Sequence, residues 1–263
     1  MTGLWPCISP LALGLLLGLP PSLSSAGSQG VTGAVVDDPA LAAVIDPLAA
    51  EFHASLGKAL VQAPQGLGRG HGDANPLGFW VADVLRERTQ ASLGAPVQAA
   101  LTNNGGLRKD LAAGPVTAQD IYELMPFEDQ IVVAEYTGAE LIQLVRETLR
   151  FNGGEPFSGL QASLDGSPAQ PRLRVTWSGG GAIDPAATYR LATSDYLFAS
   201  GDSIPTVKTG RKPIYTGLFM RQLLLDECTE LGQRKRELLP PPAGRLRVSP
   251  DLAQALRAKA VQW

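Results

Sequence analysis

A loop near the middle of the chain combines residue types that can hold a planar, anionic ligand. Asn103 can present both an acceptor and donors to the edge of a base, and Arg108 can bind a phosphate through two parallel hydrogen bonds. Gly105 and Gly106 lie between them and let the backbone approach a ligand closely. Because Asn-Gly-Gly is also a common turn sequence, this loop alone does not decide between binding and turn formation.

Two aromatic residues and a carboxylate on later loops could complete such a site. Phe127 follows Pro126 and Tyr196 follows an expected strand, so the two rings could hold a base between them. Each stacking contact of this kind contributes on the order of 1–3 kcal/mol. Asp202 could accept hydrogen bonds from ribose hydroxyls. Either ring could instead belong to the core, and the Asp202 segment could be a tight turn.

Metal-assisted hydrolysis of phosphoesters is not supported by the sequence. It needs two cations a few ångströms apart, held by a cluster of His, Asp and Asn ligands. The chain has two histidines. His53 falls within an expected helix, and His71, with Asp73 nearby, could supply one ligand but not a dinuclear site. The sequence also has neither a Walker loop nor a Gly-x-Ser-x-Gly elbow, so we predict no catalytic residue, metal or cofactor in this chain.

The apolar pattern predicts the elements that position these side chains. Apolar residues at spacings of three and four predict an amphipathic helix over 38–57. A short apolar run at 97–102 predicts a strand that leads into the Asn103 loop. We also expect helices over 75–88, 117–125, 137–150 and 215–227, and strands over 130–136, 172–177 and 189–193. Mixed elements without regular βαβ alternation predict an α+β domain.

The two ends of the chain differ from this central part. An apolar run from Leu11 to Leu19, followed by small residues, predicts a signal peptide over 1–26 that is cleaved after Ala26. We therefore expect an exported protein, periplasmic or extracellular, with no membrane span after cleavage. We assign 27–62 to a connector-like helix, 63–232 to the main domain, and 233–263 to a tail that acts as a linker with a short helix.

Charge and cysteine content exclude further classes. With 22 Lys+Arg against 25 Asp+Glu, the formal charge is -3 and there is no basic stripe, so a nucleic-acid polymer is not an expected partner. After signal cleavage Cys228 would be the sole cysteine, which rules out an internal disulfide and fits a small core residue.

Taken together and in order, these segments resemble the C-terminal, substrate-specificity domain of the 5′-nucleotidase family. The resemblance runs from about Ala42 to Glu227 and implies a layered α/β/β/α sandwich. Its landmarks are Leu77–Asp83, Asn103–Arg108, Met125–Phe127, Tyr136–Gly138 with Leu141, Phe157–Gly159 and Tyr189–Asp202.

The resemblance also implies a role for each candidate residue. Asn103 would contact the base, Phe127 and Tyr196 would stack on it, Asp202 would bind the ribose, and Arg108 would bind a phosphate. A further family phosphate-binding arginine falls near Arg69 or His71. Three positions depart from the family pattern and could reshape the site: Phe79, Ser200 and Ser203.

Three functions are compatible with this pattern. The family's catalytic domain would lie upstream of Asp38, where we expect only the signal peptide and connector. We therefore favour a nucleotide-recognition subunit that joins a separately encoded, exported metallophosphoesterase, with divalent metals only in that partner. The alternatives are a free-standing nucleoside or nucleotide binder and a degenerate structural domain in which Phe127 and Tyr196 are packed away.

Overall fold

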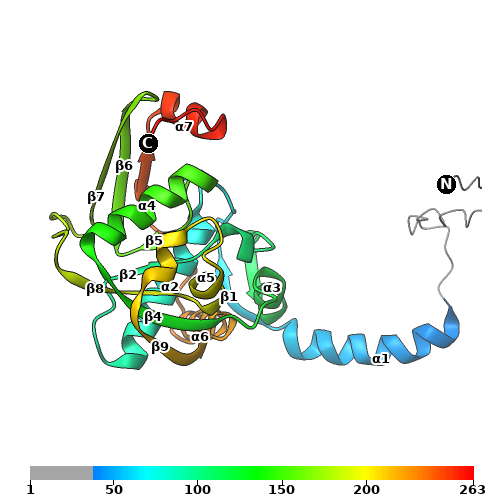
Figure 1. The fold of residues 1–263 in the computed structure, drawn as a ribbon. Helices are drawn as coiled ribbons and strands as arrows, with labels where there is room; N and C mark the ends of the chain where they lie inside the picture. The colour runs from blue at the N-terminus through cyan, green and yellow to red at the C-terminus, as the bar shows by residue number, and fades with distance from the viewer. Residues whose placement is uncertain (1–37) are drawn as a thin grey trace, which may run out of the picture. The chain divides into compact units, whose positions relative to one another are not determined.

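The computed structural model describes residues 38–263 (Figure 1). The predicted signal peptide at 1–26 and the start of the connector lie outside the described residues. The helix expected over 38–57 is present as α1 (Pro39–Leu56). It begins in a first compact unit, which ends at Asp46, and continues into a second, Pro47–Trp263, that contains all the elements below.

A five-stranded sheet forms the centre of the second unit. Its strands lie in the order β5 (Phe157–Ser158), β2 (Ala99–Leu101), β8 (Thr188–Ser194), β4 (Gln130–Thr137) and β9 (Arg211–Phe219). Strands β2 and β8 are parallel, so the loops that follow them leave the sheet at the same edge. Strand β4 is antiparallel to β8, with Ile131 opposite Ser194, so the loop that precedes β4 reaches that edge too. The topology therefore gathers three loops at one place.

Each face of this sheet buries its own hydrophobic core, because successive residues of a strand point to opposite sides. Ala100 and Ala192 contribute to the core that contains α2 (Pro76–Leu93) and α6 (Met220–Gln233). Their neighbours Ala99 and Leu191 contribute to the core that contains α4 (Gly138–Asn152). Cys228 is fully buried in the first core, as expected, and burial raises its pKa to about 12.

Two smaller sheets complete the layers. Strand β1 (Ala59–Ala63) pairs with β3 (Gly114–Thr117), which leads into α3 (Ala118–Leu124). Strands β6 (Leu160–Ser167) and β7 (Gln170–Trp177) form a long hairpin (Figure 1). The expected fold class, a layered α+β sandwich, is confirmed. None of the helices within 38–263 is long and apolar enough to cross a membrane.

The ends of several helices follow from local sequence signals. Thr117 with Asp120, and Thr137 with Glu140, form reciprocal capping boxes at the starts of α3 and α4. Asn75 caps α2 by accepting a hydrogen bond from the Gly78 N–H at 3.0 Å.

The expected helix over 215–227 is wrong in its first turn. Residues up to Phe219 belong to β9, and α6 begins at Met220. Tyr215 and Phe219 lie opposite Val132 and Gln130 of β4, and cross-strand pairing outweighs the helical spacing of the apolar residues.

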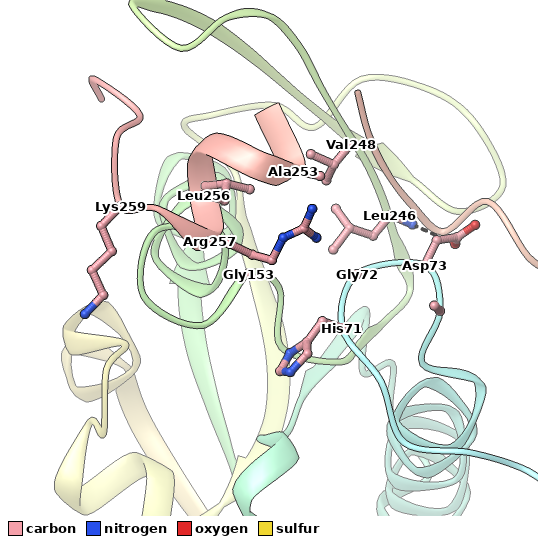
Figure 2. A pocket seen from close by; sticks show the side chains of 11 residues that line it. His71, Gly72, Asp73, Gly153, Leu246, Val248, Ala253, Leu256, Arg257 and Lys259 are labelled. Atoms are coloured by element: carbon pink, nitrogen blue, oxygen red, sulfur yellow. Dashed lines mark hydrogen bonds between the residues drawn. The ribbon is translucent and has the colours of Figure 1, made fainter. Parts of the chain in front are cut away.

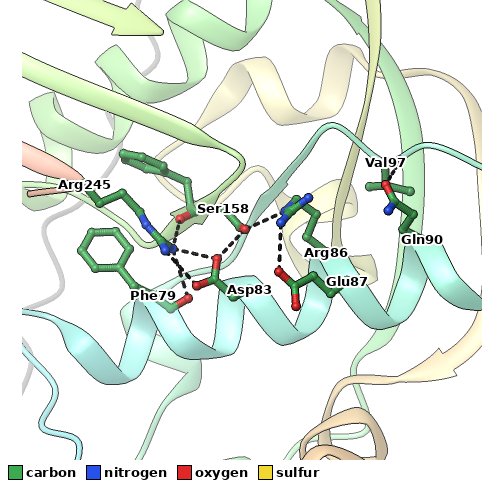
Figure 3. A network of polar contacts seen from close by, with 9 residues as sticks. Phe79, Asp83, Arg86, Glu87, Gln90, Val97, Ser158 and Arg245 are labelled. Carbon is green, nitrogen blue, oxygen red and sulfur yellow. Dashed lines mark hydrogen bonds and ion pairs between the residues drawn. The ribbon is translucent and has the colours of Figure 1, made fainter. Parts of the chain in front are cut away.

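The segment 233–263 is a part of the fold, whereas we expected a linker with a short helix. The helix is present as α7 (Pro250–Arg257), and before it β10 (Leu246–Val248) pairs in parallel with β6. The Arg245 guanidinium donates two hydrogen bonds to the Asp83 carboxylate, at 2.9 and 2.8 Å (Figure 3). It also lies over the Phe79 ring, 4.9 Å from the centroid, so the unusual Phe79 is a packing partner of the tail.

Candidate functional site

The three loops at the sheet edge enclose a cavity of about 320 Å³. Five of the six predicted site residues line it: Asn103 and Arg108 after β2, Phe127 before β4, and Tyr196 and Asp202 after β8. These residues span about a hundred positions of the sequence and are brought together by the strand order described above. The cavity is also lined by Gly105, Gly106 and Asp129.

The Asn103 loop is held in place by partly buried polar contacts around its neighbour, Asn104. The Asn104 N–H donates to the Glu155 carboxylate at 2.6 Å, and its side-chain oxygen accepts from Asn75 Nδ2 at 2.6 Å. Further along, the Arg108 N–H donates to the Leu124 carbonyl at 2.8 Å. Asn104 is therefore a structural residue, whereas Asn103 lines the cavity, with 8% of its surface exposed.

The glycines of this loop leave room for the side chain of Asn103. A Cβ at Gly106 would lie 3.2 Å from Asn103 Oδ1, closer than an ordinary contact, whereas a Cβ at Gly105 would lie 3.5 Å from Asn103 Nδ2. Gly106 is thus the position at which any side chain would push on the Asn103 amide.

The two aromatic residues have different surroundings. Phe127 packs on the edge of the first core, and Arg108 lies over its ring with Cζ 5.1 Å from the centroid. Tyr196 lies in α5 (Asp195–Ser200) and is 51% exposed. This exposure does not support the alternative in which both rings are packed away.

Asp202 follows the end of α5 in an unusual backbone conformation. Its φ is 42°, in the left-handed region, directly after Gly201 with φ 75°. The Asp202 N–H donates to the Ser200 hydroxyl at 3.1 Å, so the departure from the family pattern at 200 supports this turn. Asp202 Oδ2 also accepts a 3.4 Å hydrogen bond from Asn103 Nδ2, which joins the two sides of the cavity.

Asp129 is a cavity residue that the sequence reasoning missed. Burial, with a smaller contribution from the charge of Asp195, raises the pKa of its carboxyl group. The sequence carries no local signal for it, because the chain bends at Phe127 and Asp129 lies in the short segment between that bend and β4.

Arg69 is not brought into this cavity. Its Nε and its backbone N–H both donate to the Asp110 carboxylate at 2.9 Å, and Nη1 donates to the Leu107 carbonyl at 3.1 Å. The side-chain hydrogen bond from Arg69 is the main cause that lowers the pKa of Asp110. In this structure Arg69 therefore supports the backbone next to Arg108.

A larger cavity, of about 510 Å³, lies between the 71–74 loop and the tail (Figure 2). Its apolar wall comes from β10 and α7, including Leu246, Val248 and Leu256. Asp73 ties its two sides together, since both its oxygens accept from the Gly244 N–H at 2.8 Å. No cluster of three or more His, Cys, Asp or Glu side chains that could hold a metal occurs among the residues that the structure describes.

Comparison with known proteins identifies the fold. Residues 56–209 match the family described as 5′-nucleotidase, C-terminal domain. The chain belongs to this family. Every residue that lines the smaller cavity lies within the matched part of the chain, between α2 and η2 (Pro205–Thr209). The three loops at the sheet edge therefore belong to the 5′-nucleotidase C-terminal domain.

The relatives are considerably longer than this chain. The trifunctional nucleotide phosphoesterase protein YfkN of Bacillus subtilis is 26% identical over 182 residues, which are 65% of this chain and 12% of that protein. Protein UshA of Yersinia enterocolitica is 24% identical over 198 residues, 73% of this chain and 35% of UshA. The crystal structure of a 5′-nucleotidase precursor from Thermus thermophilus superposes with a TM-score of 0.63 and 24% identity, over 80% of this chain and 42% of that one.

Proposed function

We propose that this 5′-nucleotidase C-terminal domain binds a nucleotide or nucleoside in the 320 Å³ cavity. The observation that carries the proposal is the convergence of five residues, chosen from the sequence for base, ribose and phosphate chemistry, on one cavity. A base would lie between Phe127 and Tyr196, with Asn103 at its edge. Asp202 would accept hydrogen bonds from the ribose hydroxyls.

Arg108 is placed to bind a phosphate of the same ligand. Among residues 38–263 its guanidinium forms no ion pair, and its one recorded partner is the face of Phe127. A guanidinium that is positioned by a ring but not neutralised by a carboxylate retains its donors for an anion.

The proposal is tested by calorimetric titration of the chain with adenosine, AMP and UDP-glucose. We expect binding by the wild type and a loss of about 10- to 100-fold in affinity for Phe127→Ala. Trp263→Ala is the matched control, because Trp263 is an exposed ring that does not line the cavity. Affinity that is the same in wild type and Phe127→Ala would refute the assignment of the cavity.

We further propose that the domain works in nucleotide breakdown with a metallophosphoesterase, encoded separately and exported to the same compartment. One observation favours this role over a free-standing binder. The relatives include a protein named as a nucleotide phosphoesterase, of which this chain matches 12%. The leader-like segment at 1–26 supports export, periplasmic or extracellular.

Reconstitution tests this second step. The purified chain is mixed with exported metallophosphoesterases from the same genome, and phosphate release from AMP is measured with and without divalent metal. Release that requires both proteins and is lost in Phe127→Ala would support the split enzyme. Nucleotide binding without any stimulated release would leave the free-standing binder as the function.

A further inference from the structure

The carboxylate of Asp129 has no role in the nucleotide binding proposed above. Asp129 lines the cavity together with Phe127 and Tyr196. Its charge interacts with that of Asp195, the residue that precedes Tyr196. Asp129 thus comes from the chain next to one ring and lines the same cavity as both rings, so a base held between them would share the cavity with this carboxylate.

Asp129 has unused hydrogen-bonding capacity on its side chain. Its backbone carbonyl accepts from the Met220 N–H at 2.9 Å. Within the part of the chain that the structure describes, no hydrogen bond or ion pair to its carboxylate is recorded. A half-buried carboxylate without partners is unfavourable, and a ligand that supplies N–H donors removes that cost.

We propose that Asp129 determines which base is bound, by accepting hydrogen bonds from adjacent N–H groups, and that it thereby favours guanine. This inference rests on the proposed function. Guanine presents N1–H and the 2-amino group side by side, which matches the two oxygens of a carboxylate. Hypoxanthine lacks the 2-amino group, adenine presents a ring acceptor beside its amino group, and uracil flanks its one N–H with carbonyl oxygens that an ionised carboxylate repels.

The size of the preference follows from the chemistry of one charged hydrogen bond. Such a bond contributes about 1.5–3 kcal/mol, which corresponds to about 10- to 100-fold in affinity. We therefore expect guanosine to bind at least about 10-fold more tightly than inosine, which differs from it only by the 2-amino group.

The test is a calorimetric titration with guanosine, inosine, adenosine and uridine. The wild-type ratio of guanosine to inosine affinity needs no variant and tests the inference directly. In Asp129→Asn we expect this ratio to fall to within about threefold, since one acceptor oxygen becomes a donor. Asp195→Asn is the control, because it removes the neighbouring charge but keeps the oxygen that accepts the Tyr196 N–H, so the ratio should persist.

The outcomes separate the inference from the proposed function. Equal affinities for guanosine and inosine in the wild type, with binding that is lost in Phe127→Ala, would overturn the role of Asp129 and leave the binding function intact. A preference for guanosine that survives in Asp129→Asn would also overturn it. If no nucleoside binds the wild type, both the proposed function and this inference fail.

Discussion

The two sides of the cavity are built differently. We call Asn103–Arg108 with Phe127 the anchored side, and Tyr196 with Asp202 the exposed side. On the anchored side, the backbone is fixed by Asn75, Glu155 and Leu124, and Phe127 rests on a core. On the exposed side, a six-residue helix carries a ring that is half exposed. The anchored side is therefore preorganised by contacts outside the cavity, whereas the ring of the exposed side lies half open to solvent.

The ion pair between α2 and the tail gives the largest expected effect on stability. Asp83 of α2 binds Arg245 of the tail, and their side chains are 23% and 14% exposed. Asp83→Ala leaves a largely buried guanidinium unpaired, so we expect the free energy of unfolding to fall by about 2–3 kcal/mol.

Urea denaturation measures this loss. Asp165→Ala is the control, because its partner Arg172 is 79% exposed and such surface pairs contribute about 0–1 kcal/mol. Equal losses in the two variants would show that the tail is peripheral to the fold after all, as the sequence had led us to expect.

The exposed side should contribute to binding without contributing to stability. Tyr196→Ala removes a ring that is 51% exposed, so we expect about a 10-fold loss in nucleoside affinity and a change in unfolding free energy within about 0.5 kcal/mol. Calorimetry and urea denaturation of the same preparation measure both. A loss of unfolding free energy well above about 0.5 kcal/mol would contradict the distinction between the two sides.

A single methyl group added at Gly106 should displace the Asn103 amide on the anchored side. In Gly106→Ala the new Cβ would lie 3.2 Å from Asn103 Oδ1, which must shift by a few tenths of an ångström. We expect about a fivefold loss in affinity, on the order of 1 kcal/mol. Gly105→Ala places its Cβ 3.5 Å from Asn103 Nδ2 and should bind as the wild type does. Equal effects at the two glycines would show that the position of the Asn103 amide is not what matters.

The sequence predicted the helix starts and the cavity residues that depend on residue type and on local order along the chain. Both capping boxes and the loop residues Asn103, Arg108, Phe127, Tyr196 and Asp202 could be chosen from residue type and order. The tail could not be predicted, because β10 pairs with β6 more than eighty positions away and its triple proline is typical of a linker. Asp129 was missed for a related reason, since only the fold shows that a residue next to one ring also lies close to the helix of the other.

The segment that follows the exposed side is held to α4 by polar contacts. Thr206, in η2 beyond Asp202, donates to the Glu147 carboxylate at 3.0 and 2.7 Å. Arg211, at the start of β9, binds the Glu140 carboxylate at 2.9 and 2.8 Å. The hydrogen bonds from Arg211 are the main cause that lowers the pKa of Glu140 from 4.5 to about 2.

The sign of the pH effect follows from that shift. Because the folded pKa lies below the unfolded one, the stabilisation is fully present above pH 4.5 and is lost as the pH falls toward 2. Since Arg211 is 45% exposed, solvent screening limits the effect to about 1 kcal/mol or less. Arg211→Gln should reduce this pH dependence, whereas Arg172→Gln in the β6–β7 hairpin should not. Urea denaturation at pH 5 and pH 3 measures the difference. An identical pH dependence in wild type and Arg211→Gln would show that this ion pair does not contribute to the stability of the folded state.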